Sequence, residues 1–124
     1  MGFRRRLLVL DKAHSLLLDV NRTAPGIRRA HHQPIKRQLV KSALSVSSCI
    51  SEGRAKSSER EFVRFLEIAL GSSGELESQL KVATECDAIP VVVGNDLKDR
   101  AAEVSKMLHG LIKKIRVDLG DNPK

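Results

Sequence analysis

One stripe of apolar and small side chains between residues 58 and 86 constrains the fold of this chain more than any other feature. It consists of seven residues spaced by four or three positions: Phe62, Leu66, Ala69, Ser73, Leu76, Leu80 and Ala83. That spacing places all seven on one face of an α-helix. Ser58 followed by Glu61 is a capping-box pattern, which marks a helix start, and the next proline is Pro90. The sequence therefore predicts a helix over about residues 59–86.

Two further helices are predicted before this one. The first covers about residues 5–22 and carries two overlapping stripes, of which the more apolar is preferred for the core: Leu10, Ala13, Leu17 and Val20. After the turn signal Pro25-Gly26, the second covers about residues 34–52. Its stripe is Ile35, Leu39, Ala43, Val46 and Ile50. Gly53 is well placed to end this helix in a left-handed conformation.

A fourth helix is predicted over about residues 96–119. Either Asn95 or Asp96 can cap its start, and Gly120 can end it. Its stripe has the most regular spacing in the chain: Leu97, Ala101, Val104, Leu108, Leu111 and Ile115. Residues 87–94 are then left as the connection between the third and fourth helices.

These four segments predict an all-α fold, an antiparallel up-down-up-down four-helix bundle. The short links and the length of 124 residues favour a single domain, residues 1–124. The chain has three Phe and neither Tyr nor Trp, a composition that disfavours a β-sandwich.

Some apolar residues are left outside the predicted core and suggest assembly. Val91, Val92 and Val93 lie in the predicted connection, where they pack over the bundle end or are covered by another subunit. Val63, Leu70 and Gly74 lie on a flank of the third helix. Exposed apolar area of this extent is unusual for a monomer, so we expect a homo-oligomer with these six residues as contacts.

The charge is unevenly distributed, with a net of +9 for residues 1–56, from twelve Lys or Arg and three Asp or Glu, against −2 for the remainder. Such asymmetry favours an anionic partner, although a charged surface also simply confers solubility. Attraction to phosphates needs only an array of cations. The candidate contacts to nucleic acid are Arg4, Arg5, Arg6, Arg28, Arg29, Lys36, Arg37, Lys41, Arg54 and Lys56.

Catalytic chemistry is not expected. No nucleophile is paired with a base, and the Glu-x-x-His pairs of di-iron bundles are missing from the sequence. We therefore predict no enzyme activity, no metal and no cofactor. Asp11, Lys12 and His14 interrupt the apolar N-terminal stretch, so we expect neither a secretory signal nor a membrane span. Cys49 and Cys86 are expected to be reduced thiols of a cytoplasmic protein.

Several stretches resemble the bacterial four-helix bundle proteins, also called the 23S rRNA intervening sequence proteins. They are CISEG at residues 49–53, SEREFVRFLEIALGS at 58–72, ELESQL at 75–80 and MLHGLI at 107–112. The likeness covers about residues 35–115. Cys49 and Ser51 depart from it, because the family more often has Asn and Ala before Glu-Gly.

The resemblance implies a left-handed four-helix bundle that assembles into a pentameric ring. It also implies a link to nucleic acid: some members are encoded within ribosomal RNA genes, and distant relatives bind a reverse transcriptase and nucleic acid through a basic surface. No catalytic residues are established in the family, so none is transferred. The residues thus predict a non-enzymatic, homo-oligomeric bundle whose basic surface binds the RNA or DNA backbone, and the resemblance implies that the oligomer is a pentamer. The alternative is a protein-interaction or scaffold module.

Overall fold

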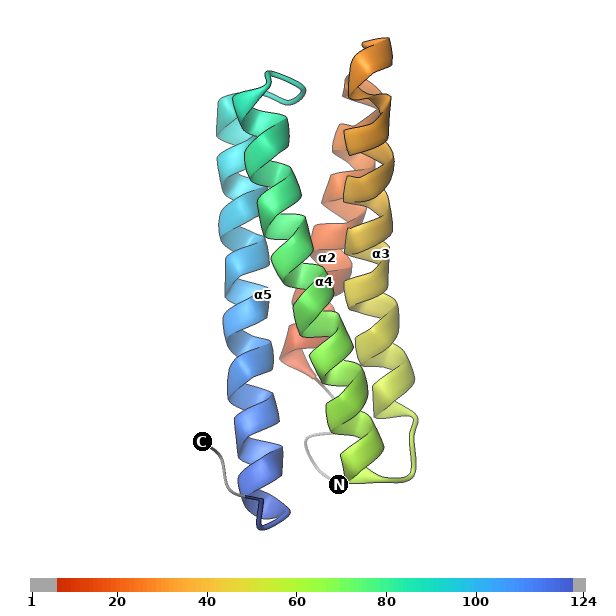
Figure 1. Ribbon diagram of the computed structural model, residues 1–124, viewed down its shortest axis with the longest axis vertical. Coiled ribbons are helices and arrows are strands. Elements are labelled where there is room, and N and C mark those ends of the chain that lie inside the picture. Colours follow the sequence, from red (N-terminus) through yellow and green to blue (C-terminus); the bar gives the residue numbers. More distant parts are fainter. Residues whose placement is uncertain (1–6, 122–124) are drawn as a thin grey trace.

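The computed structural model describes residues 7–121 and contains four long α-helices there. They are α2 (Leu8–Thr23), α3 (Gln33–Arg54), α4 (Glu59–Glu85) and α5 (Val91–Asp118), with two 3-10 turns, η1 (Ala24–Gly26) and η2 (Ala30–His32), between α2 and α3. Successive helices run in opposite directions (Figure 1). The described residues form no strand, and the predicted all-α, up-down-up-down bundle is confirmed.

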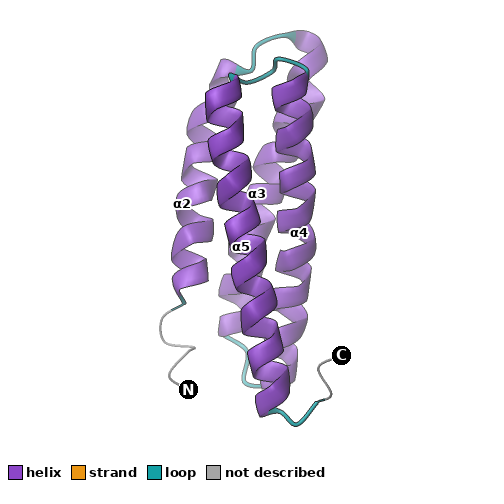
Figure 2. Cartoon of the chain, turned by 90° about the vertical axis from the view of Figure 1, so that its left-hand side faces the viewer, coloured by secondary structure: helices purple, strands orange, loops and turns teal. Residues whose placement is uncertain are grey.

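The two ends of the bundle differ in what they carry. At one end lie the α2–α3 connection, residues 24–32, and the α4–α5 connection, residues 86–90; we call this the double-loop end (Figures 1 and 2). The other, terminal end carries the α3–α4 connection, residues 55–58, together with the start of α2 and the end of α5. The central helix α4 packs extensively on both α3 and α5, whereas the shorter α2 has smaller contacts with α3 and α5.

The core is built on the stripe of α4. All seven predicted residues are buried, and the Ser58 side chain accepts a hydrogen bond from the Glu61 backbone N–H at 3.3 Å, which confirms the predicted helix start. In α3, four of the five predicted stripe residues are buried, and Ile35 is half-buried. The largest fully buried side chain is Phe62. Burial of these apolar side chains is the main favourable contribution to folding.

The predicted inward face of the first helix was partly wrong, because the buried face is rotated about the helix axis relative to the prediction. In α2, Val9 and Leu16 are buried with Ala13 and Val20, whereas Leu10 and Leu17 are only half-buried. The apolar arc of α2 is wider than one stripe, so its neighbours α3 and α5 decide which part faces inward. A similar shift occurs in α5, where Ile112 is buried and Leu111 is half-buried.

The start of the fourth helix was also predicted wrongly. It begins at Val91, after an extended Pro90 at the N-cap, and the Gly94 N–H donates to the Pro90 carbonyl at 2.8 Å. Val91, Val92 and Val93 are therefore the first turn of α5 and not a connection. Pro90 is extended, with φ of −60° and ψ of 144°, and no side chain caps the helix start.

Gly53 does not end α3 in a left-handed conformation, as was predicted. The helix continues to Arg54, and a Cβ added at Gly53 would lie 2.7 Å from the Phe65 Cβ of α4. The glycine is thus required for the close approach of α3 and α4. Gly120 was predicted to end the last helix; α5 ends at Asp118, and Gly120 follows it with φ of 81°, in the left-handed region.

Candidate nucleic-acid interface

Residues 20–51 contain no Asp or Glu. This segment forms the end of α2, the α2–α3 connection and most of α3. It holds six Lys or Arg residues. One of them, Arg22, is paired with Asp19 at 2.7 Å. The other five are Arg28, Arg29, Lys36, Arg37 and Lys41, which we call the α3 cation group.

The α3 cation group is available to a ligand. Arg28 and Arg29 are exposed between the two 3-10 turns; Arg37 and Lys41 are exposed on α3, and Lys36 is half-buried there. Within residues 7–121, none of these five side chains forms an ion pair or a hydrogen bond. These five cations lie within residues 28–41 and have no paired carboxylate among the described residues. Together they produce a local positive potential, which attracts phosphates.

The remaining predicted contacts lie elsewhere. Arg54 and Lys56 are at the terminal end, about 20 Å along α3 from Lys41 at 1.5 Å per residue. The Lys56 Nζ lies 5.0 Å from the centre of the Phe65 ring, a cation–π distance. Arg4, Arg5 and Arg6 lie outside the described residues. The structure thus brings half of the predicted set together and separates Arg54 and Lys56 from it.

Several cations elsewhere on the described helices are paired with carboxylates. Lys12 pairs with Glu103 at 3.2 Å, and Arg60 makes a two-pronged contact with Asp121 at 3.0 and 3.2 Å. Arg116 pairs with Glu67. Each of these pairs joins residues far apart in the sequence, so these cations serve the fold. The α3 cation group has no such role among the described contacts.

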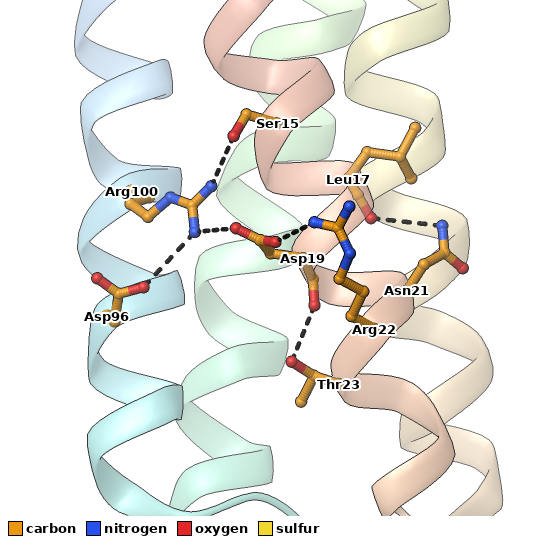
Figure 3. Close-up of polar contacts among 8 residues, drawn as sticks. All are labelled: Ser15, Leu17, Asp19, Asn21, Arg22, Thr23, Asp96 and Arg100. Atoms are coloured by element: carbon orange, nitrogen blue, oxygen red, sulfur yellow. Dashed lines mark hydrogen bonds and ion pairs between the residues drawn. The ribbon is translucent and has the colours of Figure 1, made fainter.

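The largest polar network joins α2 to α5 near the double-loop end (Figure 3). Arg100 of α5 donates to Asp19 at 2.7 Å and to Ser15 at 3.2 Å, and it also pairs with Asp96 at 3.5 Å. The hydrogen bond from Arg100, and then that from Arg22, holds the pKa of Asp19 below its ordinary value. The charges of this network balance one another, so we assign it to the fold.

A shallow apolar groove of about 480 Å³ lies beside the α3 cation group. His31, His32, Pro34 and Ile35 line one side, and Val82 and Cys86 of α4 line the other. The two imidazole rings are 4.3 Å apart. Sequence reasoning missed this groove, because no local pattern brings Val82 next to Ile35.

The predicted oligomer contacts divide by exposure. Val63 is 6% exposed and takes part in the core of its own chain, and Leu70 is half-buried. Gly74 is exposed, with open space where a Cβ would lie. Val91 and Val92 are 56% and 82% exposed at the double-loop end, and Val93 is half-buried.

Other chemistry has little support from the described side chains. Residues 7–121 contain no group of three or more His, Cys, Asp or Glu placed to hold a metal ion. Cys49 and Cys86 are free thiols. None of the described helices is both long and apolar enough to cross a membrane.

Comparison with known proteins shows the relationships of this chain. A family model described as 23S rRNA-intervening sequence protein matches residues 5–110. The fold is similar to a crystal structure of a protein of unknown function from the S23 ribosomal protein family of Bacteroides thetaiotaomicron. The two share 22% sequence identity and superpose with a TM-score of 0.77 over 86% of this chain and 99% of that one. No curated protein matches the chain.

Proposed function

The chain belongs to the 23S rRNA-intervening sequence protein family, and on that premise we propose that it is a non-enzymatic, homo-oligomeric bundle that binds the backbone of RNA or DNA. We place this activity in the cytoplasm. The α3 cation group supplies the binding surface. The observation that carries the proposal is the absence of any acidic residue from position 20 to position 51, together with the lack of ion pairs between those five cations and any carboxylate within residues 7–121.

Phosphate contacts of this kind are not specific for sequence. A row of Lys and Arg binds by displacing counterions from the nucleic acid, so its affinity falls steeply as salt rises. Arg28 and Arg29 lie in a connection and Lys36 to Lys41 on a rigid helix, so the cations are presented on a fixed scaffold. A charged helix face with this geometry suits the backbone of a folded RNA better than the edges of its bases.

Assembly would repeat this surface in space. Val91 and Val92 remain exposed in the first turn of α5, at the same end of the bundle as Arg28 and Arg29. We propose that these valines are covered in a homo-oligomer, pentameric if this chain follows the family resemblance. Several cation groups on one particle would bind a long strand more tightly through multivalency. Light scattering supports assembly if the mass is a multiple of 13.7 kDa, and a 13.7 kDa particle at high concentration removes this part of the proposal.

The binding proposal is tested by neutralising three cations at once. We expect the triple variant Lys36→Gln, Arg37→Gln, Lys41→Gln to bind a structured RNA at least about tenfold more weakly at low salt, because three phosphate contacts are lost. Fluorescence anisotropy of the labelled RNA gives the dissociation constant.

The matched control carries the same change of charge elsewhere. Lys106, Lys113 and Lys114 are exposed on α5 and form no ion pair among the described side chains. Replacing these three by Gln is expected to change the affinity by less than about threefold, the residual effect of net charge. Equal losses in the two triple variants, or no binding by the natural chain at low salt, would refute the proposal.

A protein-interaction module is the second candidate. The 82% exposure of Val92 favours it, since an aliphatic side chain this exposed at a helix start is a good contact for a protein partner. Under this alternative, both triple variants capture the protein partner as well as the natural chain does. Val92→Ser abolishes that capture.

A further inference from the structure

The groove beside the α3 cation group has an unusual lining for a surface depression. Its exposed lining is mostly apolar, contributed by Ile35 and Pro34 at the start of α3 and by Val82 near the end of α4. Val82 is 53% exposed, so its methyl groups face solvent in the isolated chain. The groove is shallow and open to solvent, so a ligand in it would keep part of its surface exposed.

Two imidazole rings add a second feature to the same groove. His31 is exposed, whereas His32 is only 7% exposed and has no hydrogen-bond partner within residues 7–121. Neither ring nitrogen of His32 is among the described side-chain atoms that are fully buried without a hydrogen-bond partner, so these nitrogens keep some contact with solvent. His32 therefore offers an accessible ring nitrogen to whatever occupies the groove.

The cations of the α3 cation group flank the groove lining in the sequence. Arg28 and Arg29 precede the two histidines, and Lys36 directly follows Ile35. Lys41 follows Gln38, another lining residue, by three positions and so lies on the same side of α3. On α4, the nearby Glu85 is paired with Lys81 at 3.9 Å. A ligand in the groove thus has unpaired positive charges beside it.

We propose that the groove receives the base of an unpaired nucleotide whose phosphates lie on the α3 cation group. This inference rests on the proposed function and assigns its substrate class: single-stranded segments of RNA or DNA. A nucleotide has both of the features that this site would bind. It carries a flat base with apolar faces, and a negatively charged phosphate is attached to the same sugar. Bases in single strands stack on imidazole rings and pack on aliphatic side chains, whereas duplexes hide their base faces.

The experiment compares a single strand with a duplex of the same length by fluorescence anisotropy. We expect Val82→Ser and His31→Ala each to weaken binding of the single strand by about fivefold to tenfold and to leave duplex binding unchanged. His31→Phe, which keeps a ring for stacking, is expected to retain single-strand binding. The control is Val117→Ser on α5, because Val117 is also 53% exposed but lies at the terminal end.

Cys86 provides a direct readout of occupancy. This exposed free thiol lines the groove, whereas Cys49 is half-buried on α3 and serves as the internal reference. We expect a bound single strand to slow alkylation of Cys86 and not of Cys49, and a duplex to slow neither. Adenosine monophosphate carries a base and a phosphate as a free small molecule, outside any strand. If it protects Cys86 at the strand's concentration, the assignment to a strand is overturned.

The outcomes separate this inference from the proposed function. If Val82→Ser and His31→Ala leave the single-strand preference unchanged while the Lys36, Arg37 and Lys41 triple variant still loses binding, the groove assignment fails and the backbone proposal stands. If the triple variant loses nothing, both fail. A change of particle mass in Val82→Ser, without a change in strand preference, would assign the groove to contact with a second copy and overturn the inference.

Discussion

Gly53 lies at a close approach of α3 to α4, and its missing side chain permits that approach. A Cβ at this position would meet the Phe65 Cβ at 2.7 Å and the Phe62 ring at 3.2 Å. From the sequence, Gly53 was interpreted as a left-handed helix end. A glycine after a polar turn is typical both of such an end and of a close contact between two helices. Only the packing of two helices distinguishes them.

We expect Gly53→Ala to destabilise the protein by about 1–3 kcal/mol through overpacking, even though alanine is the better helix former. Urea unfolding followed by circular dichroism measures the change. Gly71→Ala is the control: Gly71 is exposed in α4 with open space at its Cβ position, so this variant is expected to gain about 0.5–1 kcal/mol. A Gly53→Ala protein as stable as the Gly71→Ala protein would contradict the packing role.

Asp19 gives a pH dependence whose sign follows from its partners. Arg100 and Arg22 depress the folded-state pKa of Asp19, so the carboxylate stabilises the fold above its unfolded-state pKa. That stability is lost as the pH falls through the folded-state pKa. We expect Asp19→Asn to lower the thermal midpoint near neutral pH and to match the natural chain in strong acid.

The control for this pH series is Asp99→Asn. Asp99 is exposed on α5 and forms no ion pair among the described residues. Its replacement is expected to leave the thermal midpoint unchanged across the series. A constant difference between Asp19→Asn and the natural chain at all pH values would show that the carboxylate charge is not what stabilises the α2–α5 contact.

At the scale of elements, the end of α4 is followed by a residue with positive φ that was not predicted from the sequence. Asp87 has φ of 63°, and the Asp87 and Ala88 N–H groups donate to the Thr84 and Ala83 carbonyls at 3.2 and 2.8 Å. This is the hydrogen-bond pattern of a Schellman motif, which normally takes glycine at the left-handed position. The turn directs Ala88 and Ile89, both buried, over the double-loop end.

We expect Asp87→Gly to stabilise the protein by about 0.5–1 kcal/mol, because glycine adopts positive φ without a steric penalty. Differential scanning calorimetry measures the shift in melting temperature. Glu85→Gly is the control, since it places a glycine inside the last turn of α4 and is expected to destabilise by about 1 kcal/mol. A loss of stability in Asp87→Gly would mean that the aspartate side chain matters more than the backbone conformation.

The elements differ in how far the sequence determined them. The stripe and cap of α4 are local, so its face and its start at Glu59 followed directly from spacing. The start of α5 was missed because Val91, Val92 and Val93 carry no capping side chain and favour strands by propensity. The inward face of α2 was shifted because Leu10 and Leu17 belong to a broad apolar arc whose neighbours decide its orientation.

At the scale of the whole molecule, the sequence identified the cations and the structure identified which of them are unpaired. Arg100 and Asp19 are 81 residues apart, so no local pattern reveals that this pair is internal to the fold. The same holds for Val82, which lies beside Ile35 only because α3 and α4 pack side by side. Patterns along the chain find residue types, but compensation of charge and the lining of a groove depend on tertiary packing.

The central claim is that five uncompensated cations on α3 and its preceding connection bind nucleic-acid phosphates. Its most direct test is the slope of the logarithm of RNA affinity against the logarithm of salt concentration, measured for the natural chain and the Lys36→Gln, Arg37→Gln, Lys41→Gln variant. Each lost phosphate contact reduces the slope by about one, so we predict a slope shallower by about two to three in the variant. Identical slopes for the two proteins would contradict the claim.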